Sequence, residues 1–99
     1  MISVRFTRDG DGRLRSFTAK NHGKSSACAA VSLFVLNTVN CVEALTDEKF
    51  SCDYEEEGGF IRFSLSEPPR DGARLLLETL LYGLKSVKEQ YPTEIDVKD

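Results

Sequence analysis

The sequence has few of the residues that build metal sites or disulfide frameworks. It contains one histidine and three cysteines, and no two of these cysteines have the C-x-x-C spacing typical of zinc sites. A disulfide framework uses paired cysteines, which an odd number does not suit. We therefore expect no metal, no cofactor and three reduced thiols, those of Cys28, Cys41 and Cys52.

The sequence also lacks a long hydrophobic run, an N-terminal leader and an excess of positive charge. No apolar stretch approaches the length of a bilayer span, and no basic segment followed by an apolar one opens the chain. We therefore expect a cytoplasmic protein without membrane contact. With 13 Lys and Arg against 16 Asp and Glu, the formal net charge is −3. That balance argues against direct nucleic-acid binding and suits a basic protein or peptide partner.

What the sequence does contain is the patterning of one α+β domain spanning residues 1–99. Its hydrophobic share of 40% is ordinary for a globular protein, and no repeat or linker divides it. Both helices should lie on one face of a mostly antiparallel sheet, in a two-layer ββαββαβ order. Alternation predicts strands and three-and-four spacing predicts helices, in this order: strands 2–7 and 13–20, helix 25–45, strands 50–54 and 61–65, a helix from Pro68-Pro69 to Pro92, and strand 94–98.

Two turns and one irregularity complete this pattern. Asp9-Gly10-Asp11-Gly12 predicts a hairpin turn because Asp and Gly tolerate positive φ, and residues 55–59 predict a second one. The apolar residues Leu14, Phe17 and Ala19 change parity once along the second strand. This change favours a β-bulge there.

The helix predicted over 25–45 is apolar almost all round in its first half. A helix packed on one sheet needs only a single apolar stripe, so this helix needs a second cover. A second copy of the chain is the simplest source of that cover. We therefore expect a homodimer that uses this helix.

The candidate chemistry lies between the second strand and this helix. His22, the only histidine, precedes Cys28 by six residues, and Cys28 falls in the first turn if Ser25 or Ser26 is the N-cap. Unpaired N–H groups and partial positive charge at a helix N-terminus stabilise a thiolate and can hold an oxyanion. An imidazole within reach can take or return the thiol proton near neutral pH. The spacing is therefore compatible with a nucleophilic Cys28 and a His22 general base and acid.

Each of these residues also has a structural interpretation. Cys28 can be a small buried apolar residue, and His22 a surface loop residue. Ser32, one turn after Cys28, can hydrogen-bond near the sulfur or simply permit close packing. Cys41 and Cys52 are expected to be core thiols. A non-catalytic module, or a redox-sensing thiol with a resolving cysteine nearby, therefore remains an alternative to an enzyme.

The segment Asn21-His22, followed by Cys28-Ala29-Ala30-Val31-Ser32, resembles the signature of the bacterial ribosomal-processing cysteine proteases (Prp). The resemblance extends over essentially the whole chain, from the N-terminal hairpin to the short last strand. It implies a dimeric cysteine endopeptidase that removes an N-terminal extension from a large-subunit ribosomal protein. It also implies that Cys28 is the nucleophile and His22 the general base and acid. The runner-up function is a non-catalytic binding module associated with ribosome assembly.

The sequence departs from the family pattern at three points. Asn21 stands where the family usually has glycine, and asparagine can adopt the left-handed angles that a glycine there would use. The segment from His22 to Cys28 is shorter than in many members, and Ser25 and Ser26 replace an acidic residue often found before the cysteine. Asn21 is thus a candidate for orienting His22, and Asn21 and Ser32 are candidates for contacting substrate.

Overall fold

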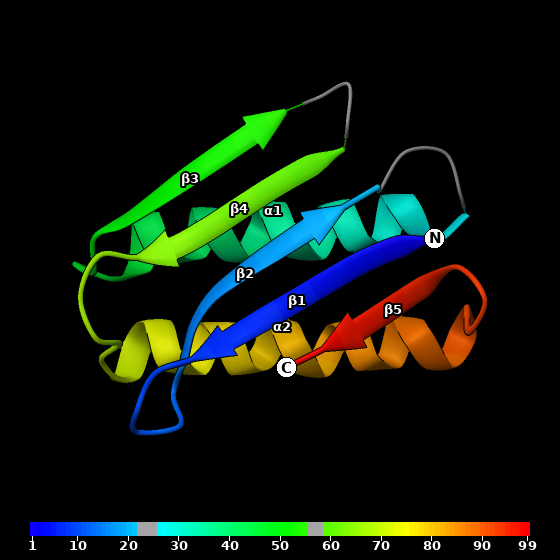
Figure 1. Cartoon of the computed structure of the whole chain (residues 1–99). Coiled ribbons are helices and arrows are strands. Elements are labelled where there is room, and N and C mark those ends of the chain that lie inside the picture. The colour runs from blue at the N-terminus through cyan, green and yellow to red at the C-terminus, as the bar shows by residue number, and fades with distance from the viewer. Residues whose placement is uncertain (22–25, 56–58) are drawn as a thin grey trace.

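The computed structural model describes residues 1–21, 26–55 and 59–99. Within these residues the chain forms a five-stranded sheet with two helices on one of its faces (Figure 1). The strand order is β3-β4-β2-β1-β5, antiparallel except for the parallel pairing of β1 with β5. This arrangement confirms the predicted two-layer ββαββαβ fold. The elements are β1 (Ile2–Arg8), β2 (Leu14–Lys20), α1 (Ser26–Leu45), β3 (Phe50–Glu55), β4 (Phe60–Leu65), α2 (Asp71–Gln90) and β5 (Ile95–Lys98).

The β1–β2 hairpin has both the turn and the bulge that its sequence predicts. In the turn, the Asp9 carboxylate accepts hydrogen bonds from the backbone N–H groups of Asp11 and Arg13, and Gly12 has a φ of 81°. Thr7 pairs with Ser16 but Arg8 pairs with Leu14, so one extra residue is accommodated on β2. The bulge lets apolar residues of opposite parity face the helices together.

Helix α1 is buried along one side and apolar on the other. Its buried side, which includes Ala27, Val31 and Val35, joins the core beneath the sheet. Leu33 on the other side is 71% exposed, and Phe34 and Leu36 are exposed as well. The expectation that no segment has the length and composition of a bilayer span is wrong. The stretch Ala27–Leu45 has 19 residues and a mean hydropathy of 1.6. The core helix of a soluble protein can have the same length and hydropathy. In this structure one side of α1 packs against the sheet of its own chain.

Helix α2 packs beside α1, and the acidic residue Glu48, which precedes β3, caps the N-terminus of α2. The Glu48 carboxylate accepts hydrogen bonds from the backbone N–H groups of Arg70 at 2.6 Å and Ala73 at 2.7 Å. It thereby satisfies N–H groups that lack partners within the helix. The three-and-four spacing predicts an apolar stripe that also includes Leu76 and Tyr91, and these two are half-buried against the core. The other residues of the stripe are fully buried: Ala73, Leu77, Leu80, Leu81, Leu84 and Val87.

The prediction that Cys41 and Cys52 are core thiols is wrong for both residues. Cys52 is exposed on β3, because this edge strand lies at the margin of the sheet, where its helix-facing side is poorly covered. Cys41 is half-buried and lies outside the core cluster. Alternation along β3 therefore identified a strand but not a buried face.

Candidate active site

Cys28 is the third residue of α1, as the predicted helix start requires. It is half-buried and packs partly against the core, so it is not the fully buried apolar residue of the structural interpretation. The Cys28 Sγ lies 3.9 Å from the Ser32 Oγ, one helical turn on. Ala29 beside it is exposed. The structure therefore brings Cys28 and Ser32 together on a face of α1 that is partly open.

A carboxylate from the other end of the chain lies at this helix start. The backbone N–H of Ala27 donates a hydrogen bond of 3.3 Å to Oε1 of Glu94. The main chain of Glu94 is held in turn, since its C=O accepts from the Ile2 N–H at 2.9 Å and its N–H donates to the Tyr91 C=O. A carboxylate at a helix N-terminus is stabilising, and α1 has no acidic residue in its own first turn. The Ala27 N–H is therefore occupied and is not available to an oxyanion while Glu94 stays in place.

Sequence reasoning did not find Glu94. The one available signal was the absence of an acidic residue from the first turn of α1, which calls for a carboxylate from elsewhere. Nothing in the neighbouring sequence identifies the segment that supplies this carboxylate. Glu94 is 67 positions from Ala27, and the pairing of β5 with β1 brings it to α1.

Asn21 lies immediately after β2 and has the left-handed backbone expected there, with a φ of 62°. Figure 1 shows that the end of β2, the start of α1 and the segment before β5 meet at one side of the molecule. His22 and Ser25 lie outside the described residues, so the predicted approach of the imidazole to the thiol stays a prediction. Asn21 itself is exposed, as suits a residue that contacts a ligand or the following segment.

The described residues include no group of three or more His, Cys, Asp or Glu side chains that could hold a metal ion. The reactive group that the described residues offer here is the thiol of Cys28, at the start of α1. Its immediate surroundings are a serine hydroxyl and the carboxylate-bound N–H of the preceding residue. These groups are compatible with nucleophilic attack on a carbonyl carbon.

Comparison with known proteins adds independent information. A family model of the cysteine protease Prp matches residues 1–96. The ribosomal processing cysteine protease Prp of Staphylococcus aureus is 28% identical over 101 residues, covering 96% of this chain and 95% of the relative. The Bacillus subtilis protein of the same name is 29% identical over 107 residues, covering 98% and 96%.

A solved structure agrees with these two relatives. The crystal structure of the essential ribosomal processing protease Prp from S. aureus holds a covalently linked product peptide. It matches 99% of this chain and 98% of its own, with a TM-score of 0.91 and 27% sequence identity. The agreement of family model, relatives and structure over nearly the full length shows that the chain belongs to the cysteine protease Prp family.

Proposed function

We propose that this protease removes an N-terminal extension from a large-subunit ribosomal protein, with Cys28 as nucleophile and His22 as general base and acid. The observation that carries the proposal is the position of Cys28. It is half-buried at the third residue of α1, in a chain that matches the cysteine protease Prp family over residues 1–96. The relatives' name, ribosomal processing cysteine protease, supports the substrate class.

The proposed reaction has two halves. In the first, His22 takes the thiol proton and the Cys28 thiolate attacks the carbonyl carbon of the scissile peptide bond. The tetrahedral intermediate expels the amine, which receives the proton from His22, and a thioester remains on Cys28. In the second, His22 removes a proton from water and the resulting hydroxide attacks the thioester, releasing the carboxylic acid and the thiol. The covalently linked product peptide in the S. aureus relative is compatible with an intermediate of this kind.

Ser32 and Asn21 have supporting roles in this proposal. The Ser32 hydroxyl, 3.9 Å from the sulfur, limits how the Cys28 side chain can turn and can contact bound peptide. Asn21 sets the direction of the chain immediately before His22 through its left-handed backbone. Both act on the geometry of the reacting pair, and neither changes covalently.

The proposal includes a homodimer in the bacterial cytoplasm. Two neighbouring helices expose large apolar side chains on the side away from the sheet, including Leu33 and Phe34 on α1 and Leu75 and Tyr82 on α2. A second copy of this surface would cover them without further partners.

Cytoplasmic location is tested by fractionation of cells that express the tagged chain, and recovery in the membrane fraction would contradict it.

The test of the reaction is cleavage of the host's ribosomal protein made with its N-terminal extension, followed by mass spectrometry. Cys28→Ala, Cys28→Ser and His22→Ala should each abolish cleavage while circular dichroism and thermal unfolding stay unchanged. Cys52→Ser is the matched control, because Cys52 is an exposed thiol on the edge strand β3, and it should cleave at the wild-type rate. Cleavage retained by any of the first three variants would exclude the mechanism.

A further inference from the structure

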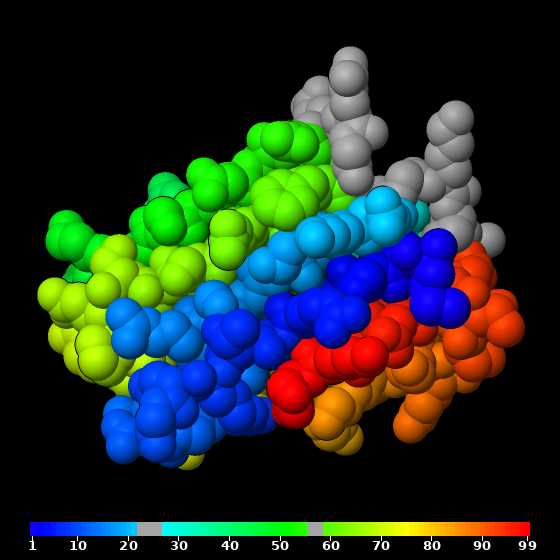
Figure 2. All heavy atoms as spheres, viewed as in Figure 1, coloured from blue at the N-terminus to red at the C-terminus, as the bar shows by residue number. Residues whose placement is uncertain are grey.

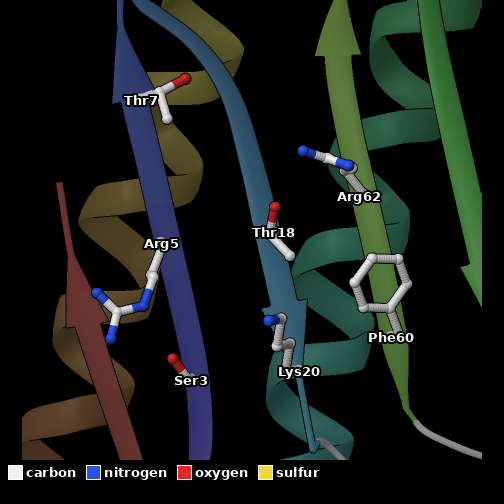
Figure 3. A pocket seen from close by; sticks show the side chains of 7 residues that line it. All are labelled: Ser3, Arg5, Thr7, Thr18, Lys20, Phe60 and Arg62. Carbon is white, nitrogen blue, oxygen red and sulfur yellow. The ribbon is translucent and has the colours of Figure 1, made fainter.

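The face of the sheet opposite the helices is turned toward the viewer in Figure 2. It carries an open hollow that the proteolytic mechanism does not use. Its volume is about 310 Å³. Figure 3 shows the lining side chains on β1, β2 and β4, on the side of the strands turned away from the helices. They include three cations, Arg5, Lys20 and Arg62, together with an aromatic ring and several hydroxyls.

The strand register sets the spacing of the three cations. Arg62 pairs with Thr18, and Thr18 pairs with Arg5, so the two arginines flank β2 in one row. Neighbouring strands are about 4.8 Å apart, which places their α-carbons about 10 Å from each other. Lys20 lies two residues farther along β2, about 7 Å from this row. The three cationic residues are thus anchored at α-carbons about 7 to 10 Å apart. From these positions their long side chains can reach successive phosphates of an extended nucleic-acid strand.

These cations form no ion pair with the described residues. The positive charge of Arg5 does reach Asp96, whose carboxyl pKa is lowered first by its hydrogen bond from Lys88 and then also by the charges of Lys88, Lys98 and Arg5. Among the described residues, no carboxylate oxygen lies within 4.0 Å of a charged nitrogen of Arg5, Lys20 or Arg62. The acids that flank these residues are on the edge strands, where Asp53 pairs with Arg62, Glu55 pairs with Phe60 and Asp96 pairs with Ser3. A polyanion would therefore be attracted to the three central strands and repelled at both margins.

The remaining lining groups suit bases and sugars. Phe60 begins β4 and is half-buried, and its ring lies on the same face as Lys20 and Arg62 (Figure 3). Half-exposed aromatic rings on a sheet face are stacking surfaces for unpaired bases. The Ser3 and Thr18 hydroxyls between the cations can donate to and accept from a ribose 2′-OH.

We propose that this face binds a short single-stranded segment of RNA, with phosphates on Arg5, Lys20 and Arg62 and a base stacked on Phe60. The three central strands span about 10 Å, which admits one extended strand, whereas a double helix would also meet Asp53 and Asp96. An acidic peptide would find the same cations, but it has no base to place on Phe60 and no ribose for the hydroxyls.

The net charge of −3 led us to predict no direct contact with nucleic acid. The net charge does not describe how charged residues are distributed over the surface. On this face of the sheet the acidic residues lie on the edge strands β3 and β5. Lys20 ends β2, and Asn21 follows it at the side of the molecule where α1 begins. RNA on this face would therefore hold the protease with its Cys28 end close to the nucleic acid.

The test is fluorescence anisotropy with a labelled eight-nucleotide single-stranded RNA of mixed sequence, titrated with the full chain at 50 to 200 mM salt. Three phosphate contacts predict a slope of log affinity against log salt of about −2. Arg62→Ala should weaken binding and make the slope shallower by about 0.7. Phe60→Leu should weaken binding about tenfold with the slope unchanged. Arg74→Ala is the matched control, since Arg74 is an exposed cation on α2, and it should bind like the wild type.

Three comparison ligands decide what the surface recognises. DNA of the same sequence, the RNA duplex and an eight-residue glutamate peptide should each bind more weakly than the single-stranded RNA. Equal affinity for any of them, or unchanged binding by the Arg62→Ala and Phe60→Leu variants, would overturn the proposal. Cleavage of the extended ribosomal protein by the same variants is measured in parallel, so loss of RNA binding and loss of proteolysis can be told apart. Cys28→Ala should keep full RNA affinity.

Discussion

The carboxylate of Glu94 accepts a hydrogen bond from the backbone N–H of Ala27, directly before Cys28. This 3.3 Å contact joins the residue before the last strand to the helix that carries the nucleophile. The first turn of α1 contains no acidic residue, and Glu94 supplies a carboxylate acceptor at this helix N-terminus. The position of the Cys28 thiol therefore depends on a residue near the opposite end of the chain.

Replacing Glu94 should weaken both the fold and the reaction. Loss of a helix-capping acceptor costs about 0.5–2 kcal/mol, so Glu94→Ala should lower the free energy of unfolding by that amount. It should also reduce kcat for the extended substrate, because the first turn of α1 becomes less fixed. Glu94→Gln keeps an acceptor oxygen and should recover most of both losses. The measurements are urea denaturation and steady-state cleavage. A Glu94→Ala protein equal to wild type in both would show that the contact contributes neither to stability nor to the reaction.

Asn21 should tolerate glycine but not a β-branched residue. Its φ of 62° lies in the left-handed region, which asparagine and glycine enter at low cost. Asn21→Gly should therefore unfold within about 1 kcal/mol of wild type. Asn21→Val should be destabilised by about 1–2 kcal/mol because its Cβ crowds the carbonyl oxygen in that conformation. Equal stabilities of the two variants in urea denaturation would contradict the left-handed backbone conformation of Asn21.

Features coded by neighbouring residues could be predicted from the sequence. The parity change between Leu14 and Phe17 indicated the bulge, and Asp9 with Gly12 indicated the hairpin turn. The stripe of α2 indicated its buried side. Each of these signals repeats over a few residues, so a single sequence carries it in full.

Features that depend on strand order could not be predicted in this way. Nothing local shows that β5 pairs with β1, and this pairing is what brings Glu94 to Ala27. Cys52 was expected in the core because the alternation along β3 does not reveal that β3 is an edge strand. The Cys28 position was predicted from the helix start, whereas the cations of the open face became neighbours only through the β1–β2–β4 register.

A charged residue on the outer side of α1 should separate the proposed dimer. Leu33 is 71% exposed among other apolar side chains, and burying a carboxylate in such an interface is costly. At micromolar concentration the wild type should sediment at twice 11.1 kDa and Leu33→Glu at 11.1 kDa. Thr7→Glu adds the same charge to the open sheet face and should remain dimeric. A wild-type monomer under these conditions would exclude the dimer.

Cys52 should react slowly at neutral pH in spite of its exposure. Partial burial of its sulfur raises the pKa of the Cys52 thiol above the ordinary 9.0, and the negative charge of Asp53 raises the pKa further. A raised thiol pKa leaves less thiolate at a given pH, and the thiolate is the reactive form. Iodoacetamide labelling followed by peptide mass spectrometry should therefore show Cys52 modified mainly above pH 9. Asp53→Asn should increase its rate at pH 8, and no increase would contradict the influence of Asp53.

The clamp around Arg8 should contribute stability at neutral pH that is lost in acid. The Arg8 guanidinium binds Asp99 at 2.8 Å and Glu78 of α2 at 3.1 Å, which ties the chain beyond β5 to a helix. The hydrogen bond from Arg8 lowers the pKa of the Asp99 carboxyl below its ordinary 3.8. A carboxyl whose pKa is lowered by folding stabilises the native state above its unfolded pKa, and this contribution disappears as the pH falls through the native pKa. Asp99→Asn should thus lower the Tm at pH 7, and the difference from wild type should shrink steadily below pH 4. A difference that stays constant down to pH 2 would mean that Asp99 acts through packing and not through its charge.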